Sequence, residues 1–181
     1  MGNLRGQAAS LSNLGIVYGR VGRHSEAIAS LKASLTIERK RGDQRSQADT
    51  LGSLGVVYER LGRYQEAFAC HQESLAIFRE LHDRRGEADT LNYLGVVYQR
   101  LGHHDEAITT LEASLAIRRE LGDRYGQAEG LRALGDVLQV VGHHQPARAA
   151  WHEALVIYEA LQVPESDEVR TRLATPAPGP V

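Results

Sequence analysis

The sequence predicts an all-α protein, a right-handed solenoid of four helix-turn-helix repeats followed by a short C-terminal helix. The first observation is a period of 40 residues, which is seen in Gly15, Gly55, Gly95 and Gly135. The second is that residues 43–82 and 83–122 align without a gap and are identical at 23 of 40 positions. The third is that apolar residues recur at spacings of three and four, as on one face of a helix. A period of this size is typical of stacked units that each bury an apolar face against the next.

We expect one array over residues 3–174. Its repeats are 3–42, 43–82, 83–122 and 123–162, and a capping helix at about 165–174 follows Pro164. Residues 175–181 contain three prolines, and we expect a disordered tail there.

Each unit is expected to form two antiparallel helices. In the second unit, Leu51, Leu54 and Tyr58 lie on one face of the first helix, and Gly62 ends it. A second apolar face follows, and Asp83 then lies where the next helix begins. Its carboxylate can accept a hydrogen bond from a free backbone N–H there.

The glycines in the middle of the first helices need a packing reason, because each costs about 0.8–1 kcal/mol relative to alanine. Four of them in one phase predict that a second helix approaches too closely for a side chain. We expect the opposing small residues to be Ala27, Ala67, Ala107 and Ala147.

Composition excludes several classes of protein. The formal net charge of −2 gives no broad electrostatic reason to bind nucleic acid or an anionic membrane. No apolar run is long enough to span a membrane. Cys70 is the only cysteine, so no disulfide can form within the chain, and a cytoplasmic location fits best.

No group of residues indicates catalysis or a cofactor. The pairs His103-His104 and His143-His144 have no cysteine to complete a zinc site, and solvated turns explain them better. Cys70 occupies a phase of small residues, which fits packing better than an activated thiolate. No glycine-rich phosphate loop is present. We therefore predict no enzyme activity, no cofactor and no metal.

The repeated residues resemble the tetratricopeptide repeat (TPR) family. Leu14, Gly15, Tyr18 and Ala27, with their echoes, match its most diagnostic positions over residues 3–162, and Trp151 occupies its aromatic site. The period differs, since the common repeat has 34 residues. The 40-residue form resembles Pins/LGN-like adaptors and the C-terminal sensor arrays of bacterial STAND (NB-ARC) regulators.

The resemblance implies that the first helix of each unit lines a concave groove. By register, the groove floor is then Ile16, Val56, Val96 and Asp136. One edge carries the arginines Arg20, Arg60 and Arg100, and the other carries the acidic residues Asp49, Asp89 and Glu129. Asn92 and Tyr93 lie between the edges. The asparagine clamp of chaperone-binding arrays is absent from the floor. An aliphatic floor beside an arginine row suits a peptide or helix that carries acidic residues.

We therefore expect a non-catalytic protein–protein interaction scaffold, the sensor or partner-binding part of a larger bacterial signalling or transcriptional regulator. Three alternatives stay open. The arginine row can simply pair with neighbours such as Asp49 and Asp89. The uncapped first helix, with Leu4, Leu11 and Val21, can mediate self-association. The chain can also be a Pins/LGN-like adaptor.

Overall fold

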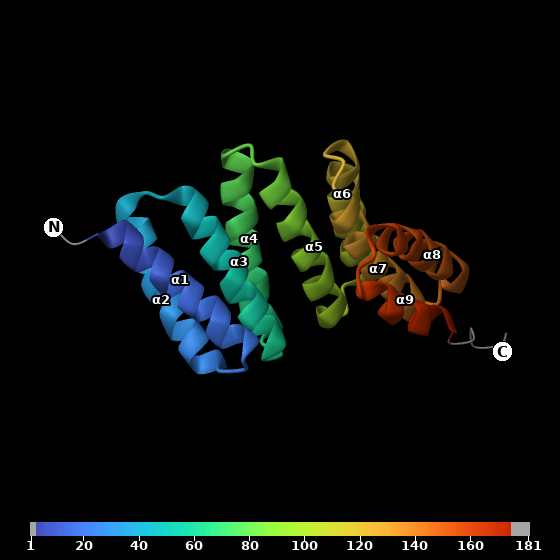
Figure 1. Cartoon of the computed structure of the whole chain (residues 1–181), viewed down its shortest axis with the longest axis horizontal. Coiled ribbons are helices and arrows are strands. Elements are labelled where there is room, and N and C mark those ends of the chain that lie inside the picture. Colours follow the sequence, from blue (N-terminus) through green and yellow to red (C-terminus); the bar gives the residue numbers. More distant parts are fainter. Residues whose placement is uncertain (1–2, 175–181) are drawn as a thin grey trace.

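The computed structural model describes residues 3–174, and within them the chain forms helices joined by short turns (Figure 1). The helices are α1 (Leu4–Arg20), α2 (His24–Arg41), α3 (Gln44–Arg60), α4 (Tyr64–Glu80), α5 (Arg84–Leu101), α6 (His104–Glu120), α7 (Arg124–Val140), α8 (His144–Leu161) and α9 (Glu165–Ala174). No strand occurs in this part of the chain. The protein is an all-α solenoid, as the sequence predicts.

The ends of the helices follow from local chemistry. Asn3, Asp43, Asp83 and Asp123 precede the first helices of the four hairpins, and each side chain accepts a hydrogen bond from the backbone N–H three residues later, at 2.9–3.3 Å. These bonds satisfy donors that a helix start leaves free. The glycines in the turns within the hairpins have positive φ values, for example 70° at Gly62, and glycine adopts such values without steric cost.

The close helix contact predicted from the glycines is present. A Cβ atom at Gly95 would lie 2.5 Å from Cγ of Leu111 and 3.4 Å from the carbonyl oxygen of Ala107. The same arrangement recurs at the other three in-phase glycines, against Leu31, His71 and Trp151. The opposing alanines are fully buried. The nearest atoms, however, belong to the side chain one turn beyond the alanine, so that side chain fills the space that glycine leaves.

A row of buried serines joins the two helices of a hairpin. Ser34, Ser74 and Ser114 donate hydrogen bonds to the backbone carbonyls of Ala8, Ala48 and Ala88, at 2.7, 2.9 and 2.7 Å. Each bond spans 26 residues and connects the second helix of a hairpin to the first.

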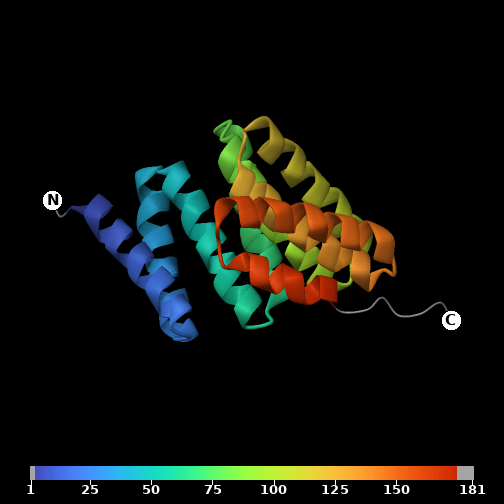
Figure 2. The same ribbon diagram turned by 45° about the vertical axis from the view of Figure 1, so that its right-hand side comes forward.

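The hairpins stack in chain order along the long axis of the molecule (Figures 1 and 2). Apolar clusters fill the interfaces, for example Leu31, Leu51 and Leu54 between the first two hairpins. At the C-terminal end, α9 packs on α8 and buries Val169. No helix of the described residues is both long and apolar enough to cross a membrane. The expected tail, 175–181, lies outside the residues that the structure describes.

Candidate binding groove

The first helices α1, α3 and α5 enclose three hollows that share residues. The hollow that we call the arginine-edge hollow has a volume of about 260 Å³. It is lined by Ile16, Gly19, Arg20, Ser53, Val56, Val57, Arg60 and Tyr93. It thus brings together five of the residues predicted from the sequence, two from the floor, two from the arginine edge, and Tyr93.

The middle hollow lies between α3 and α5 and has a volume of about 230 Å³. Val56 and Tyr93 also line it, together with Asp49 and Asp89 from the predicted acidic edge. Tyr93 is 40% exposed, although its ring lies at the junction of two hollows. The ring therefore offers a contact surface to a partner at the junction of the two hollows.

The N-terminal hollow lies between α1 and α3 and has a volume of about 360 Å³. Ile16 connects it to the arginine-edge hollow, and Asp49 connects it to the middle hollow. Glu38 of α2 also lines it. The three hollows therefore form one continuous surface on α1, α3 and α5.

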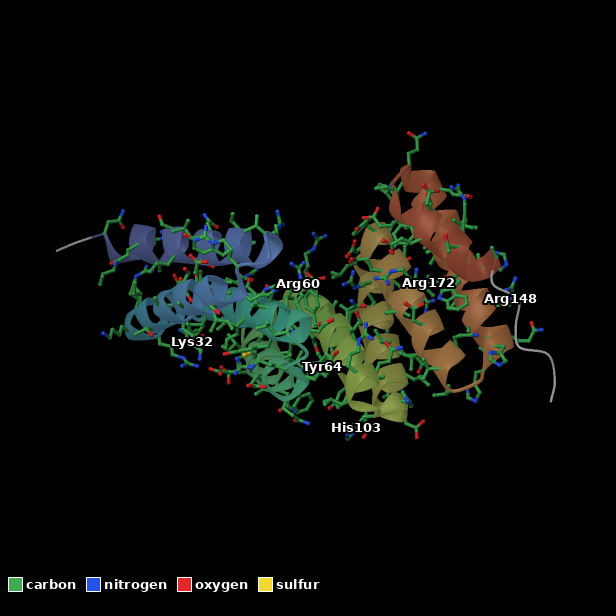
Figure 3. All side chains as sticks on the ribbon, turned by 90° about the horizontal axis from the view of Figure 1, so that it is seen from below. Lys32, Arg60, Tyr64, His103, Arg148 and Arg172 are labelled. Atoms are coloured by element: carbon green, nitrogen blue, oxygen red, sulfur yellow. The ribbon has the colours of Figure 1, made fainter. Side chains whose placement is uncertain are left out.

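Two of the three arginines of this edge interact with neighbouring groups. Arg60 donates a hydrogen bond to the carbonyl of Gly19 at 2.9 Å, which fixes its side chain at the end of α1. Arg100 interacts electrostatically with Glu59, whose pKa is raised by burial and lowered by the nearby arginines. Arg20 is exposed and makes no ion pair with any described residue. Figure 3 shows Arg60 and Arg172 toward the inside of the bend of the array, whereas Lys32 and His103 lie on the other side.

No ion pair joins these arginines to Asp49 or Asp89 within residues 3–174, although Arg60 and Arg100 interact electrostatically with another acidic neighbour, Glu59. Asp49 lies 3.7 Å from Arg45, and Asp89 lies 2.9 Å from Arg118, which also faces Glu129 at 3.7 Å. Burial raises the pKa of all three carboxyl groups, and the arginines only partly oppose this effect.

The C-terminal part of the predicted floor is occupied by the chain itself. Asp136 accepts hydrogen bonds from the guanidinium of Arg172 on α9, at 2.7 and 3.2 Å, and from the indole N–H of Trp151 at 3.0 Å. Val96 is partly buried against a cluster formed by Ala107, Leu111, Ala133 and Val137. Of the residues predicted from the sequence, the three hollows bring together Ile16, Arg20, Asp49, Val56, Arg60, Asp89 and Tyr93. The other predicted residues do not line these hollows, namely Asn92, Val96, Arg100, Glu129 and Asp136.

The environments of Cys70 and of the histidine pairs do not favour a reactive thiolate or a metal site. Burial raises the pKa of the Cys70 thiol to about 11, so the thiolate is scarce at neutral pH. Within residues 3–174, no three His, Cys, Asp or Glu side chains lie close enough to hold a metal ion. His103 instead contacts Glu106 at 3.4 Å, and His144 contacts Gln139 at 3.0 Å.

Sequence reasoning missed Glu38, Arg118 and Arg172. The positions 38, 78, 118 and 158 are in one phase and hold Glu, Phe, Arg and Tyr. All four side chains are buried. A charged residue at a phase that otherwise holds aromatic residues was the available signal. Arg172 stands 40 residues after Arg132, and α9 (Glu165–Ala174) begins 41 residues after α7 begins at Arg124.

Stacked helical hairpins with a row of connected hollows are typical of helical-repeat interaction scaffolds. The tetratricopeptide repeat model matches the chain three times, over residues 6–80, 46–120 and 86–160. The chain belongs to the tetratricopeptide repeat family, whose fold is typically a non-catalytic interaction scaffold. The resemblance seen in the sequence is confirmed at this level. No curated protein matches the chain in sequence.

Several solved structures share the fold. BtubC (BKLC) from P. vanneervenii is 23% identical with a TM-score of 0.77, and the match covers 100% of this chain and 70% of that one. A Rap protein complexed with competence and sporulation factor is 17% identical with a TM-score of 0.83, and the match covers 92% of this chain and 47% of that one. MamA is 24% identical with a TM-score of 0.65, covering 86% and 80%. The chain thus spans about half the length of the Rap structure.

Proposed function

We propose that the array binds an extended or helical segment of a partner protein across the three hollows of α1, α3 and α5. The observation that carries this proposal is the continuity of the hollows, which share Ile16, Val56, Asp49 and Tyr93. Apolar side chains of the partner would contact Val56 and Tyr93, and an acidic side chain would reach the unpaired Arg20. The Rap structure with competence and sporulation factor supports a ligand-binding role for an array of this shape.

The wider role that we propose is that of the partner-binding part of a bacterial signalling or transcriptional regulator. Its support is the resemblance of the 40-residue repeats to regulator sensor arrays. A Pins/LGN-like adaptor remains the second proposal for the parent protein, and the same groove would serve either.

The test begins with a ligand selected from a random peptide library against the intact chain. Binding is then titrated calorimetrically for the wild type, Arg20→Glu and Val56→Asp. Lys32→Glu is the matched control, because it reverses an exposed charge on the other side of the array (Figure 3). We expect both groove variants to weaken binding at least tenfold while the control does not. Equal affinity in folded groove variants would contradict the proposal.

A second candidate function is self-association through α1. Leu14 and Val17 are 46% and 53% exposed, whereas the in-phase Leu54 and Val57 are 2% and 4% exposed because α2 covers them. The α1 surface therefore has the chemistry of a helix-packing face. Light scattering of wild type and Val17→Glu over a concentration series tests it. A wild-type protein that stays monomeric at every concentration would remove this candidate.

A further inference from the structure

One residue of the groove wall has a buried carboxyl group without a counter-ion. Glu38 of α2 is 2% exposed and lines the N-terminal hollow. Its Oε1 atom contacts the hydroxyls of Ser34 and Thr50 at 2.9 and 3.0 Å, but its Oε2 atom is buried and has no partner. A buried carboxylate oxygen without a partner is costly, so a group that satisfies it would be stabilised there.

The third repeat shows which group fits this position. Arg118 stands 80 residues after Glu38, in the same phase, and its guanidinium contacts Asp89 at 2.9 Å, Asp123 at 3.6 Å and Glu129 at 3.7 Å. Gly126 makes room for this guanidinium, because any residue with a Cβ atom at that position would collide with it. A guanidinium surrounded by carboxylates is thus an arrangement that this fold already accommodates.

The first repeat keeps two of the three acidic residues and lacks the guanidinium. The residues in register with Asp89, Asp123 and Glu129 are Ala9, Asp43 and Asp49. All three line the N-terminal hollow beside Glu38. The side chain of Glu38 is smaller than those of Phe78, Arg118 and Tyr158, which occupy the same position in the other repeats. We attribute the N-terminal hollow to the volume that this smaller side chain leaves unfilled.

The second repeat supplies a cation at the corresponding place in another way. Arg45 lies 5.6 Å from the ring centre of Phe78 and contacts Asp83 at 2.5 Å and Asp49 at 3.7 Å. The residue in register with Arg45 is Arg5, which lines the N-terminal hollow but forms no ion pair with any described residue.

Charged and hydroxyl groups around the hollow set the electrostatic surroundings of Glu38. Arg41 lies beside the hollow, and its guanidinium contacts Asp43 at 3.3 Å. Burial raises the pKa of Glu38, the hydroxyls of Ser34 and Thr50 oppose this, and Asp43 and Asp49 raise the pKa further. The Ser34 hydroxyl has a single hydrogen, and it lies 2.7 Å from the Ala8 carbonyl, which accepts that hydrogen. The contact between Ser34 and Glu38 at 2.9 Å then needs a second hydrogen, which a protonated Glu38 can supply.

We propose that the N-terminal hollow binds the guanidinium of an arginine side chain that the partner protein presents, with Glu38 and Asp49 as its counter-ions. The proposal rests on the proposed groove function and adds a basic anchor to the acidic one expected at Arg20. A partner would then carry an arginine toward one end of its bound segment and an acidic residue beyond it. Binding of the cation ionises Glu38 and releases its proton to solvent, so affinity should rise with pH until Glu38 is ionised in the free protein.

The first experiment uses Nα-acetyl-L-arginine N-methylamide as the probe. Its binding is followed by amide shifts of Ala9, Ser12 and Thr50 in the intact, isotope-labelled chain. We expect saturable binding at pH 8, at least tenfold weaker for the citrulline analogue, which has the same shape without the charge. Equal binding of the citrulline analogue, or no saturation by the arginine probe, would overturn the proposal.

Variants then locate the site. Glu38→Gln should weaken the probe at least tenfold and abolish the pH dependence, whereas Glu112→Gln, an exposed change on α6, should do neither. Arg5→Gln should strengthen binding severalfold, because it removes a like charge from the hollow. Unchanged binding in a folded Glu38→Gln variant would place the probe elsewhere and overturn the assignment.

Two further comparisons distinguish a protein side chain from free arginine as the ligand, and a failure of the arginine site from a failure of the groove proposal. Free L-arginine binding as tightly as the blocked probe would indicate a small-molecule ligand instead of a protein side chain. A library-selected peptide that depends on Val56 and Arg20 but not on Glu38 would overturn the arginine site alone. A peptide that depends on none of the three would contradict the groove itself.

Discussion

The imidazole of His71 lies almost parallel to the phenol ring of Tyr93, with ring centroids 5.2 Å apart and planes at 11°. His71 is fully buried, and neither of its nitrogens has a hydrogen-bond partner. The exposed Tyr93 ring of the groove therefore rests on an unsatisfied polar side chain, at a position where the other repeats hold Leu31, Leu111 and Trp151.

His71→Leu should stabilise the protein by roughly 1–3 kcal/mol, because it removes buried polar atoms that lack partners. Leucine already fills the same phase in two other repeats, beside the same glycine. Chemical denaturation at pH 7 measures the change. A loss of stability would show that the imidazole makes favourable contacts that leucine cannot replace.

The stability of the wild type should fall on acidification. Burial lowers the pKa of His71 to about 4, below the value of 6.5 for an exposed histidine. Between these two pH values His71 binds a proton in the unfolded chain but not in the folded chain. The free energy of unfolding therefore decreases as the pH falls from about 6.5 toward about 4. The full effect is about 3 kcal/mol.

His71→Leu is the control for this pH effect, since carboxyl groups also titrate at the acidic end. The difference in unfolding free energy between the two proteins, measured at steps from pH 7.5 to 4.5, should widen in favour of the variant. A constant difference would mean that His71 is protonated as readily in the folded protein as in the unfolded one.

Gly95→Ala and Gly52→Ala should have opposite effects on the melting temperature. A Cβ atom at Gly95 would press on Leu111, and overpacking of this kind costs about 1–3 kcal/mol. At Gly52, also within a helix, no atom lies within 4 Å, so alanine should stabilise by up to about 1 kcal/mol. The same sign for both substitutions would contradict the close contact of the two helices.

Cys70 should react slowly with thiol reagents. With its pKa raised by burial to about 11, the thiol is about 0.1% ionised at pH 8. Its reaction rate with a disulfide reagent should be far below that of glutathione at pH 8 and should rise to a normal rate in denaturant. A fast reaction in the native state would indicate an accessible, activated thiolate.

The fold was predictable because the period and the apolar spacing repeat four times, and each repetition constrains the same helix contacts. Gly95 against Ala107 could be inferred from phase alone. The contact with Leu111 could not, because the direction of a side chain depends on its rotamer.

The candidate site was only partly predictable. Residues such as Val56 and Arg60 follow from register, since the first helices share one orientation in the stack. Asp136 does not, because its partner Arg172 comes from α9, which lies beyond the last full repeat. The unpartnered Oε2 atom of Glu38 depends on which neighbouring guanidinium groups fall short of it, and no spacing in the sequence encodes that distance.

The serine bonds close each of the first three hairpins on itself, since Ser34, Ser74 and Ser114 reach Ala8, Ala48 and Ala88 of their own repeats. Neighbouring hairpins share mainly apolar surface of a repeated kind. A duplicated copy of residues 83–122 would therefore meet junctions of a type that already exists. The number of hairpins can change by one genetic event without a new architecture, and the length of partner that the surface can contact changes in steps with it.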